Sequence, residues 1–329
     1  MAGTRRRGGA LVAVLWLSAA LAAIAFSLAS TVRGELERSS TQFDSTQAYY
    51  LAAGGLDRAL VYMQWGPGSQ GAAGSNRYDS PGVSRLHFEF PAGEAQVEIM
   101  PESSRINVNR APPVEILRLL AALGVEPERA AELTQAIVDW RTPPAQAGFT
   151  DFDRYYLSLT PSFPSRHASF LEKEELLLVK GMTPDIYHGA FERDARGRLQ
   201  PVGGLADCVT VLGDSGPVDV NTAPPAVLAA VGLSPQEVDA VVQARRVEPL
   251  RSVDVLRAMG LSGGALARLG VGGNWFYSLR STGRRRTPDG RMSDAVRSVG
   301  ATVRLAGGAP EDACQILRWN DQLWVRGNQ

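Results

Sequence analysis

The sequence is poor in lysine, histidine and cysteine. Its lysines are Lys173 and Lys180, and its histidines, His87, His167 and His188, lack the short spacing of a metal-binding motif. Lysine plus arginine equals aspartate plus glutamate at 34 each, so no overall positive field attracts nucleic acid. No set of nucleophile, histidine and acid can be recognised along the chain. These scarcities argue against an enzyme and against binding of nucleic acid through net charge.

The two cysteines, Cys208 and Cys314, lie far apart in the sequence. In an oxidising compartment they could form a disulfide, whose wide loop would restrict the unfolded chain appreciably. The alternative is two unpaired thiols, one or both of them buried. The sequence leaves both states open.

The composition is otherwise that of a globular protein. Hydrophobic residues make up 44% and charged residues 21% of the 329 residues, which excludes a disordered chain. A chain of this length is sufficient for two or more domains, each with its own core.

A long apolar run near the N-terminus predicts a membrane span. Residues 1–9 read MAGTRRRGG, and ALVAVLWLSAALAAIAFSLAS follows with no charge until Arg33. About 20 apolar residues, rising about 1.5 Å each, cross a bilayer core. The arginines at positions 5–7 keep the N-terminus in the cytoplasm, and the rest of the chain is then outside. A cleaved signal peptide ending near residue 30 is the alternative, but its apolar region would normally be shorter, about 7–15 residues.

The helical pattern continues beyond the membrane. Apolar residues from Val32 to Met63 recur near helical spacing until Gly66-Pro67 ends the pattern. We therefore expect one long helix, with a transmembrane part over residues 9–32 and a stem over residues 33–66 that packs on a domain outside the membrane.

Alternating apolar and polar residues predict strands on both sides of a central helical region. RLHFEF and EAQVEIM predict a hairpin within residues 67–105, after a Gly/Ser linker at residues 66–76. NWFYSLRSTG, AVRSVGATVRLA and CQILRWNDQLWV predict three more strands within residues 270–329. These segments would form one antiparallel sheet on the stem helix, interrupted in the sequence by residues 106–269.

The inserted region contains an internal repeat. INVNRAPPVEIL matches VDVNTAPPAVL, and EELLLVKGMT matches VDVLRAMGLS. In each copy an Asn or Thr before the proline pair is expected to cap a first helix, which ends at Gly124 or Gly232. A second helix then runs to Arg141 or Arg246. We infer two helical modules, the first carrying a long loop, at about residues 106–190 and 218–269.

A helix, a hairpin and a second helix are the outline of a SAM-like or helix-hairpin-helix element, which often binds the DNA backbone. Such an element uses two glycines to let backbone N–H groups approach a phosphate. The hairpins here read Gly124-Val125-Glu126 and Gly232-Leu233-Ser234, so the second glycine is missing in both. Glu126 would also put a carboxylate near the phosphate position. We therefore expect no nucleic-acid partner.

The leader and stem resemble those of the type IV pilin and pseudopilin class. In that class a prepilin peptidase cuts after a glycine, which corresponds here to Gly8 or alternatively Gly9, with residues 1–8 as the leader. Most members carry a glutamate at the fifth mature position, where this chain has Ala13 or Val14. That glutamate is thought to neutralise the N-terminal amine of the subunit above it, because an unpaired carboxylate in lipid is costly. Its absence points to a filament tip.

The order of all these features closely resembles one family, the K-type minor pseudopilins of bacterial type II secretion systems (GspK). The features are the leader without glutamate, the stem AYYLAAGGLDRAL, the two modules, LLLVKGMTPDIY and the terminal strands, and they cover nearly the whole chain. The resemblance implies an α+β fold, in which a pilin-like domain carries an inserted all-α domain. It also implies a single-pass protein of the bacterial inner membrane with most of the chain in the periplasm.

The resemblance further implies a function without catalysis. Such a subunit lies at the pseudopilus tip with the I- and J-type minor pseudopilins and other type II secretion components. It initiates or caps the filament for export of folded proteins across the outer membrane. Its own chemistry is limited to cleavage by the prepilin peptidase and subsequent N-methylation.

The resemblance also implies a calcium site in the loop after the first module. DWRTPPAQAGFTDFDRYY offers Asp139, Asp151 and Asp153 as ligands, fewer acids than relatives tend to have. Ca²⁺ takes about six to eight oxygen ligands. The alternative is that Asp151 and Asp153 cap local turns.

Other functions stay open at this point. A membrane-anchored DNA receptor of competence systems also combines a span with helix-hairpin-helix units, and a minor pilin of a type IV pilus would share the leader and stem. A periplasmic hydrolase would need catalytic residues that meet only in space. The basic segment RSTGRRRTPDGR at residues 280–291 is either a solvated hairpin tip or a contact for an acidic partner.

Overall fold

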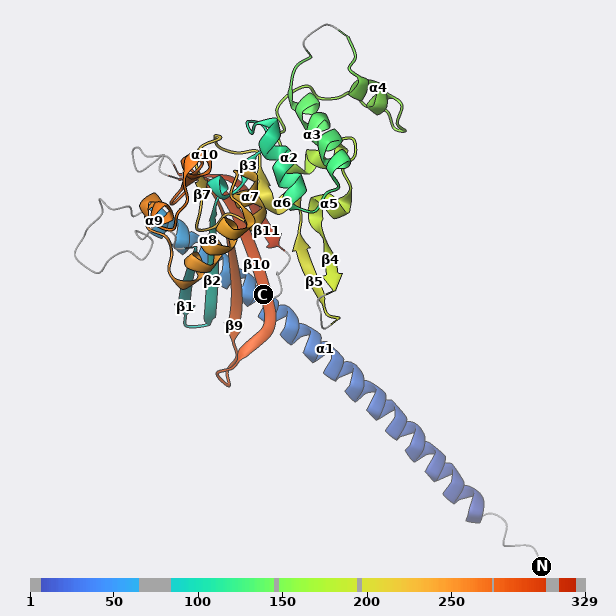
Figure 1. The fold of residues 1–329 in the computed structure, drawn as a ribbon. Helices are drawn as coiled ribbons and strands as arrows, with labels where there is room; N and C mark the ends of the chain where they lie inside the picture. Colours follow the sequence, from blue (N-terminus) through green and yellow to red (C-terminus); the bar gives the residue numbers. More distant parts are fainter. Residues whose placement is uncertain are drawn as a thin grey trace, which may run out of the picture.

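The chain folds into one long helix, an antiparallel sheet against the C-terminal half of that helix, and a mainly helical region beyond the sheet (Figure 1). The computed structural model describes residues 7–64, 84–144, 148–193, 197–273, 275–305 and 314–323. Residues 1–6 of the expected leader and the linker expected at residues 66–76 lie outside the described residues.

Helix α1, Arg7–Gln64, is continuous over 58 residues, as predicted. Its N-terminal half extends alone away from the rest of the molecule, whereas its C-terminal half lies along the sheet (Figure 1). The face toward the sheet is built of small and aliphatic residues that are buried: Ala48, Leu51, Ala52, Leu56, Ala59, Leu60 and Met63. Burial of this face against the sheet, and not helix propensity alone, stabilises the second half of α1.

The five predicted strand segments form one antiparallel sheet in the order β1-β2-β9-β10-β11, which confirms that prediction. The neighbours β2 and β9 are far apart in the sequence, and the last pair between them joins Pro101 to Tyr277. The inserted region therefore leaves and re-enters the sheet at adjacent points. The strands are β1 (Arg85–Phe90), β2 (Gly93–Pro101), β9 (Phe276–Arg286), β10 (Met292–Leu305) and β11 (Cys314–Leu323).

Two glycines allow α1 to lie very close to the sheet. A Cβ atom on Gly283 of β9 would lie 2.2 Å from the carbonyl oxygen of Ala48, and one on Gly55 of α1 would lie 2.5 Å from the Cβ of Ala95. Both distances are far below van der Waals contact. Any side chain at either position would push the helix away from the sheet.

The region between β2 and β9 is mainly helical. Its helices are η2 (Glu102–Ser104), α2 (Pro113–Ala122), α3 (Pro127–Arg141), α4 (Asp151–Leu157), η3 (Lys173–Leu178), α5 (Pro184–His188), α6 (Leu205–Cys208), α7 (Pro225–Ala230), α8 (Pro235–Val247), α9 (Val253–Ala258) and α10 (Gly263–Ala267). Two short parallel bridges join distant parts of the region: β3 (Ile106–Asn107) with β6 (Val209–Thr210), and β7 (Val218–Asp219) with β8 (Leu269–Gly270).

The expectation of an all-α insertion needs correction. The antiparallel hairpin of β4 (Gly189–Arg193) and β5 (Leu199–Gly203) projects from it (Figure 1). Gly189 ends α5 with a φ of 86° and at the same time begins β4. Because both strands are short and exposed, the sequence alternation that would have predicted them is weak. The identity of the two modules as SAM-like or helix-hairpin-helix units stays a prediction.

Matching hydrogen bonds support the internal repeat. Arg141 at the end of α3 donates to two carbonyl groups just before the first proline pair, and Arg245 in α8 donates to two carbonyl groups just before the second. The acceptors are Val108, Ala111, Val220 and Ala223. Each arginine thus fastens the second helix of its module to the start of the first.

The asparagines of the repeat have a different role from the one expected. The residues at the N-caps of α2 and α7 are Pro112 and Pro224, and no side chain caps either helix. Asn109 instead exchanges two hydrogen bonds with the backbone of Phe170, and Asn221 exchanges two with the backbone of Leu250. Each asparagine therefore ties the first helix of its module to the segment that follows the second helix.

Buried apolar residues form two clusters. One lies between α1 and the sheet, and the other fills the inserted region. The second cluster contains residues of both modules, such as Leu120 of α2 and Leu228 of α7, and these two helices pack on each other. The modules thus share one core.

A buried polar network joins the sheet to the inserted region. Glu102, which is 5% exposed, accepts hydrogen bonds from Arg105 at 2.7 Å, from Ser278 of β9 at 2.5 Å and from Thr210 of β6 at 2.5 Å. Burial disfavours the ionised carboxylate, but the charge of Arg105 and these hydrogen bonds outweigh it and lower the pKa of Glu102. The network fixes the position of the insertion relative to the sheet.

Candidate functional site

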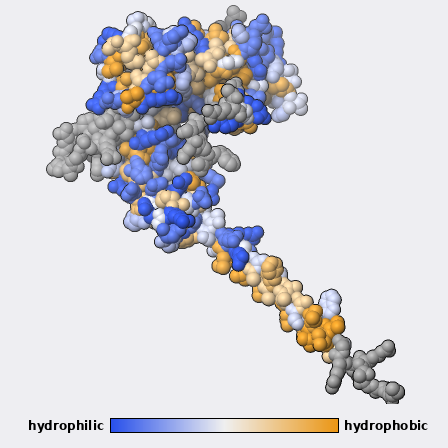
Figure 2. Space-filling model, turned by 60° about the horizontal axis from the view of Figure 1, so that its bottom comes forward, coloured by the Kyte–Doolittle hydropathy of each residue, from blue (hydrophilic) through white to orange (hydrophobic). Residues whose placement is uncertain are grey.

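The N-terminal half of α1 is an exposed apolar rod. It is long and apolar enough to cross a membrane by length and composition, and none of its most apolar stretch is buried within the protein. Figure 2 shows it as a hydrophobic stalk below a body in which hydrophilic residues predominate where the helix leaves. In water such a surface is unfavourable, so this half of the helix is suited to lipid or to other apolar helices.

The residues of the expected processing site lie at the beginning of this rod. Gly8 and Gly9 are in the first turn of α1, and Gly9 is exposed. Ala13 and Val14, at the position of the missing glutamate, lie one turn further along the same helix and are exposed. Cleavage at either glycine stays a prediction.

A second exposed apolar surface follows the stem. Leu36 and Tyr50 are 66% and 68% exposed, and Phe43 between them is also exposed. Their spacing of seven residues keeps them on one face of the helix, and the ring of Phe43 also reaches Arg285 of β9, whose guanidinium lies 4.8 Å from the ring centre. We call these three residues the stem stripe. A heptad stripe of this kind is suited to packing against another helix.

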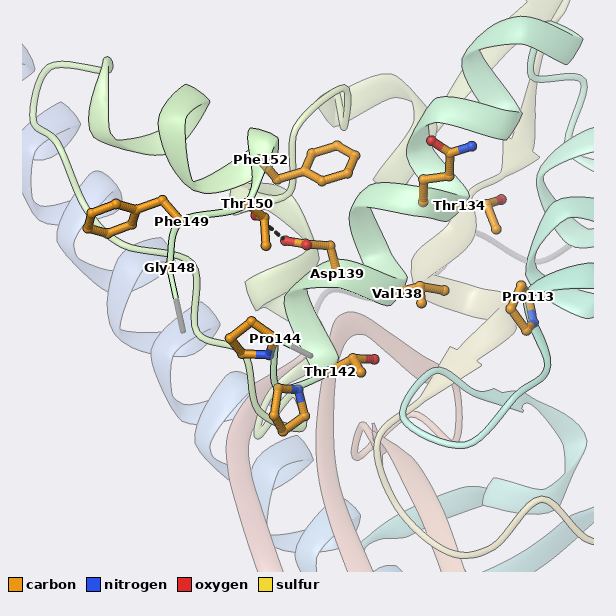
Figure 3. A pocket seen from close by; sticks show the side chains of 12 residues that line it. Pro113, Thr134, Val138, Asp139, Thr142, Pro144, Gly148, Phe149, Thr150 and Phe152 are labelled. Atoms are coloured by element: carbon orange, nitrogen blue, oxygen red, sulfur yellow. Dashed lines mark hydrogen bonds between the residues drawn. The ribbon is translucent and has the colours of Figure 1, made fainter. Parts of the chain in front are cut away.

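The first module contains a cavity of about 720 Å³. It lies between α3 and the segment that leads into α4, and its lining includes Pro113, Val138, Pro144, Phe149 and Phe152 (Figure 3). The lining is mostly apolar, so the cavity is suited to apolar side chains of a partner more than to a charged cofactor.

At the edge of this cavity a histidine closes the long loop of the first module. His167 Nε2 lies 2.9 and 3.0 Å from the two carboxylate oxygens of Asp153, and its Nδ1 lies 3.2 and 3.1 Å from the carbonyl oxygens of Asp139 and Thr142. Since every partner is an acceptor, both ring nitrogens must donate. Burial disfavours the imidazolium, but the hydrogen bond and charge of Asp153 and the two carbonyls outweigh it and raise the pKa of His167.

The three carboxylates expected to bind a metal have other partners. Asp153, 3% exposed, forms a capping box with Thr150 at the start of α4, as the turn-capping alternative expected, and it also pairs with His167. Asp139 accepts a hydrogen bond from Thr150 Oγ1 at 3.4 Å (Figure 3). The Asp151 side chain is 93% exposed and pairs with Arg154.

This arrangement does not fit a Ca²⁺ site. The imidazole of His167 faces both oxygens of Asp153, and Asp151 is turned to solvent, so the carboxylates do not converge on a common point. Within the ranges that the structure describes, no group of three or more His, Cys, Asp and Glu residues could hold a metal ion. The geometry of this loop therefore does not support the calcium site that the resemblance implied.

The hairpins of the two modules satisfy their own helix N-termini. Glu126 caps α3 by accepting a hydrogen bond from the Arg129 N–H at 3.1 Å. Ser234 caps α8 in a capping box with Glu237. At α3 the N–H of Arg129 is bonded to the Glu126 carboxylate, and at α8 the N–H of Ser234 is bonded to the Glu237 carboxylate. A carboxylate therefore lies at both positions where a helix-hairpin-helix would hold a phosphate.

Both cysteines are free thiols in this structure. Cys208 belongs to the core of the inserted region, and Cys314 packs against the core of the sheet. Burial raises the pKa of the Cys208 thiol to about 12. This fold therefore contains no Cys208–Cys314 disulfide.

Sequence reasoning missed the roles of His167, Glu102 and the two repeat asparagines. His167 reads as an isolated histidine because its partner Asp153 lies in another segment of the loop. The asparagines had a detectable signature, since Asn109 and Asn221 occupy the same place in the repeat. A polar residue kept in both copies of a repeat indicates a shared hydrogen bond as readily as a helix cap.

Comparison with known proteins agrees with this architecture. Two family models, both described as protein K of the type II secretion system, match residues 101–190 and residues 218–272. These ranges contain the two expected modules.

Relatives and a solved structure extend the likeness to most of the chain. Type II secretion system protein K of Pseudomonas aeruginosa is 28% identical over 76% of this chain and 75% of its own length, and that of Klebsiella pneumoniae is 28% identical over 75% and 76%. Protein K of Pectobacterium carotovorum subsp. carotovorum is 27% identical over 83% and 87%. A chain in the crystal structure of the GspK-GspI-GspJ complex from enterotoxigenic Escherichia coli aligns with a TM-score of 0.55 and 16% identity, over 86% of this chain and 98% of that chain, which shows a common fold. With two family models in chain order, relatives matched over most of their length and the same fold, the chain belongs to the protein K family of the type II secretion system and is a minor pseudopilin.

Proposed function

We propose that this minor pseudopilin is the tip subunit of the pseudopilus and that it acts without catalysing a reaction. It crosses the bacterial inner membrane once, with its short N-terminus in the cytoplasm and its body in the periplasm. With the I- and J-type minor pseudopilins it initiates or caps the filament, which exports folded proteins across the outer membrane.

The observation that carries the proposal is the position of the inserted region. It covers the end of the sheet that lies farthest from the apolar half of α1 (Figure 1). A further pilin-like subunit stacked above this one would have to occupy the same space. The missing carboxylate at Ala13 and Val14 agrees, since a tip subunit has no neighbour above whose N-terminal amine needs neutralising.

The partners are proposed from the solved complex and from the stem. The similar chain is found together with GspI and GspJ in that crystal structure. In this chain the stem stripe of Leu36, Phe43 and Tyr50 provides an exposed apolar seam along the stem helix. Helices of partner subunits can pack on such a seam by inserting their own side chains between its residues.

Processing provides the first test. The full chain is co-expressed with a prepilin peptidase, and the mature N-terminus is determined by mass spectrometry. A new N-terminus at Gly9 or Ala10, with the apolar helix retained, supports the proposal. An end near Ser30 would indicate an ordinary signal peptide and would remove the membrane anchor on which the tip assignment depends. A peptidase-inactive control distinguishes specific cleavage from later degradation.

A further inference from the structure

The β9–β10 hairpin extends past the rest of the sheet in the direction of the apolar half of α1 (Figure 1). The last pair between β2 and β9 on this side joins Gly93 to Arg285. The hairpin continues beyond that pair through the turn at residues 287–291, where Thr287 and Gly290 are hydrogen bonded. We call residues 284–291 the hairpin tip.

Contacts between β9 and α1 give the direction of the hairpin. Gly55 of α1 lies against Ser281, Gly283 lies against Ala48 and Ala52, and Arg285 pairs with Asp44. Moving from position 281 to 285 along β9 therefore corresponds to moving from 55 to 44 along α1. At about 3.3 Å per strand residue and 1.5 Å per helix residue these are similar lengths, about 13 and 16 Å. The strand runs nearly parallel to the helix, toward its N-terminus.

The same register predicts the level of the hairpin tip. The turn at Pro288 and Asp289 lies three or four residues beyond Arg285, about 10–13 Å, which corresponds to about 7–9 residues of α1. The tip is then level with Glu35 to Glu37, just outside the uncharged segment that ends at Arg33. Headgroups extend about 5–7 Å beyond the hydrocarbon core on each side of a bilayer. A bilayer centred on the apolar half of α1 thus brings its headgroups to the tip.

Some charged side chains of the hairpin tip form contacts within the protein, and others are exposed to solvent. Arg285 is used internally, since it pairs with Asp44 and its guanidinium lies 4.8 Å from the ring centre of Phe43. The acid of the turn, Asp289, is bonded within the turn to Thr287. Arg284, Arg286 and Arg291 are exposed. Acids are also present here: Glu94 is paired with Arg284 in the strand register, and Asp289 lies 3.7 Å from Arg291. Asp294 is exposed on the adjacent strand β10, and Glu35 and Glu37 of α1 are at the level of the turn.

We propose that the hairpin tip binds the headgroups of anionic phospholipids in the periplasmic leaflet, through Arg284, Arg286 and Arg291. This inference rests on the proposed membrane span of α1. Arginine binds phosphate through a planar array of N–H donors, and basic side chains next to an anionic bilayer are attracted over about a Debye length, near 8 Å at physiological salt. The contact would hold the periplasmic part of the chain at a fixed tilt above the membrane, before the subunit is extracted into the filament.

The test uses the full chain in nanodiscs of phosphatidylcholine alone and of phosphatidylcholine mixed with phosphatidylglycerol. Amide hydrogen exchange is followed by mass spectrometry. We expect amide exchange at residues 284–292 to be slower in the nanodiscs that contain phosphatidylglycerol than in those of phosphatidylcholine alone. Each of the three arginines should contribute about five-fold to this difference, and high salt should abolish the difference. The triple variant R284Q/R286Q/R291Q should lose this lipid-dependent difference in exchange. R246Q/R251Q/R257Q, which removes three exposed arginines from the inserted region, should retain it.

The outcomes separate this inference from the proposed function. Protected amides in residues 9–30 in both lipids, with no lipid dependence at the tip, would overturn the contact and leave the membrane span intact. Failure of the chain to enter nanodiscs would overturn both. Protection of the tip that requires I- and J-type pseudopilins, but not anionic lipid, would assign the tip to a protein partner and also overturn the proposal.

Discussion

At the scale of single residues, the carboxylate of Glu102 connects the two cores. Its partners Arg105, Thr210 and Ser278 come from three different segments, one of which follows the inserted region. Removing one member of such a buried group leaves the others without their bonds, which costs more than the group contributes in total.

We predict that Glu102→Gln lowers the free energy of unfolding by about 3 kcal/mol at pH 7. Because the folded pKa of Glu102 is lower than its ordinary value of 4.5, its stabilisation is complete above pH 4.5 and disappears as the pH falls through the folded pKa. The wild-type chain should therefore lose stability in acid more steeply than the variant. Urea denaturation of the detergent-solubilised chain at several pH values measures both. Equal pH dependence of the two chains would contradict this account.

The pairing of His167 with Asp153 makes a second prediction at this scale. His167→Gln should speed hydrogen exchange over residues 148–170, because the loop loses a charged cross-link that is 17% and 5% exposed at its two side chains. Neither Ca²⁺ nor a chelator should change the melting temperature of the wild-type chain. A calcium-dependent increase that Asp153→Asn abolishes would show that the carboxylates bind metal after all.

At the scale of secondary-structure elements, close approach of α1 to the sheet depends on glycine. We predict that Gly283→Ala destabilises the fold by about 3 kcal/mol, because its methyl group would overlap the backbone of Ala48. Gly216→Ala is the matched control, since nothing lies within 4 Å of a Cβ there. Urea denaturation of both variants in detergent measures the difference. Equal stability of the two variants would refute the packing described here.

The stem stripe makes a prediction about assembly. Leu36→Ser combined with Tyr50→Ser should leave the melting temperature unchanged, since both side chains are exposed. Binding to the I- and J-type minor pseudopilins should weaken about ten-fold for each change. Val247→Ser removes an exposed apolar side chain from the end of α8, outside the stripe, and serves as the control. Pull-down with titrated partners gives the affinities; unchanged binding would exclude the stripe as an interface.

The elements that sequence predicted best are those with a strong local pattern. The long helix, the five strands and the helix ends at Gly124 and Gly232, which have φ values of 78° and 107°, follow from periodicity and from the glycine requirement at a helix C-terminus. The β4–β5 hairpin was missed because both strands are short and exposed. The hydrogen bonds of Glu102 and the pairing of His167 with Asp153 were missed because the partners lie in other segments of the sequence. Only the folded chain brings them together.

At the scale of the whole molecule, three parts have three separate environments. The apolar half of α1 is suited to a bilayer, the stem stripe to partner helices, and the inserted region closes the far end of the sheet (Figures 1 and 2). One continuous helix, α1, links the first two, and the Glu102 network holds the third in place. This division agrees with the proposed place of the chain at the end of the pseudopilus.

The central claim is that the chain joins the I- and J-type minor pseudopilins as a single tip subunit. The most direct measurement is native mass spectrometry of the full chain, co-expressed with both partners and a prepilin peptidase and extracted in detergent. We predict one complex that contains one copy of each of the three subunits, with this chain cleaved after Gly8 or Gly9. A chain recovered alone, or a polymer of this chain with itself, would contradict the account.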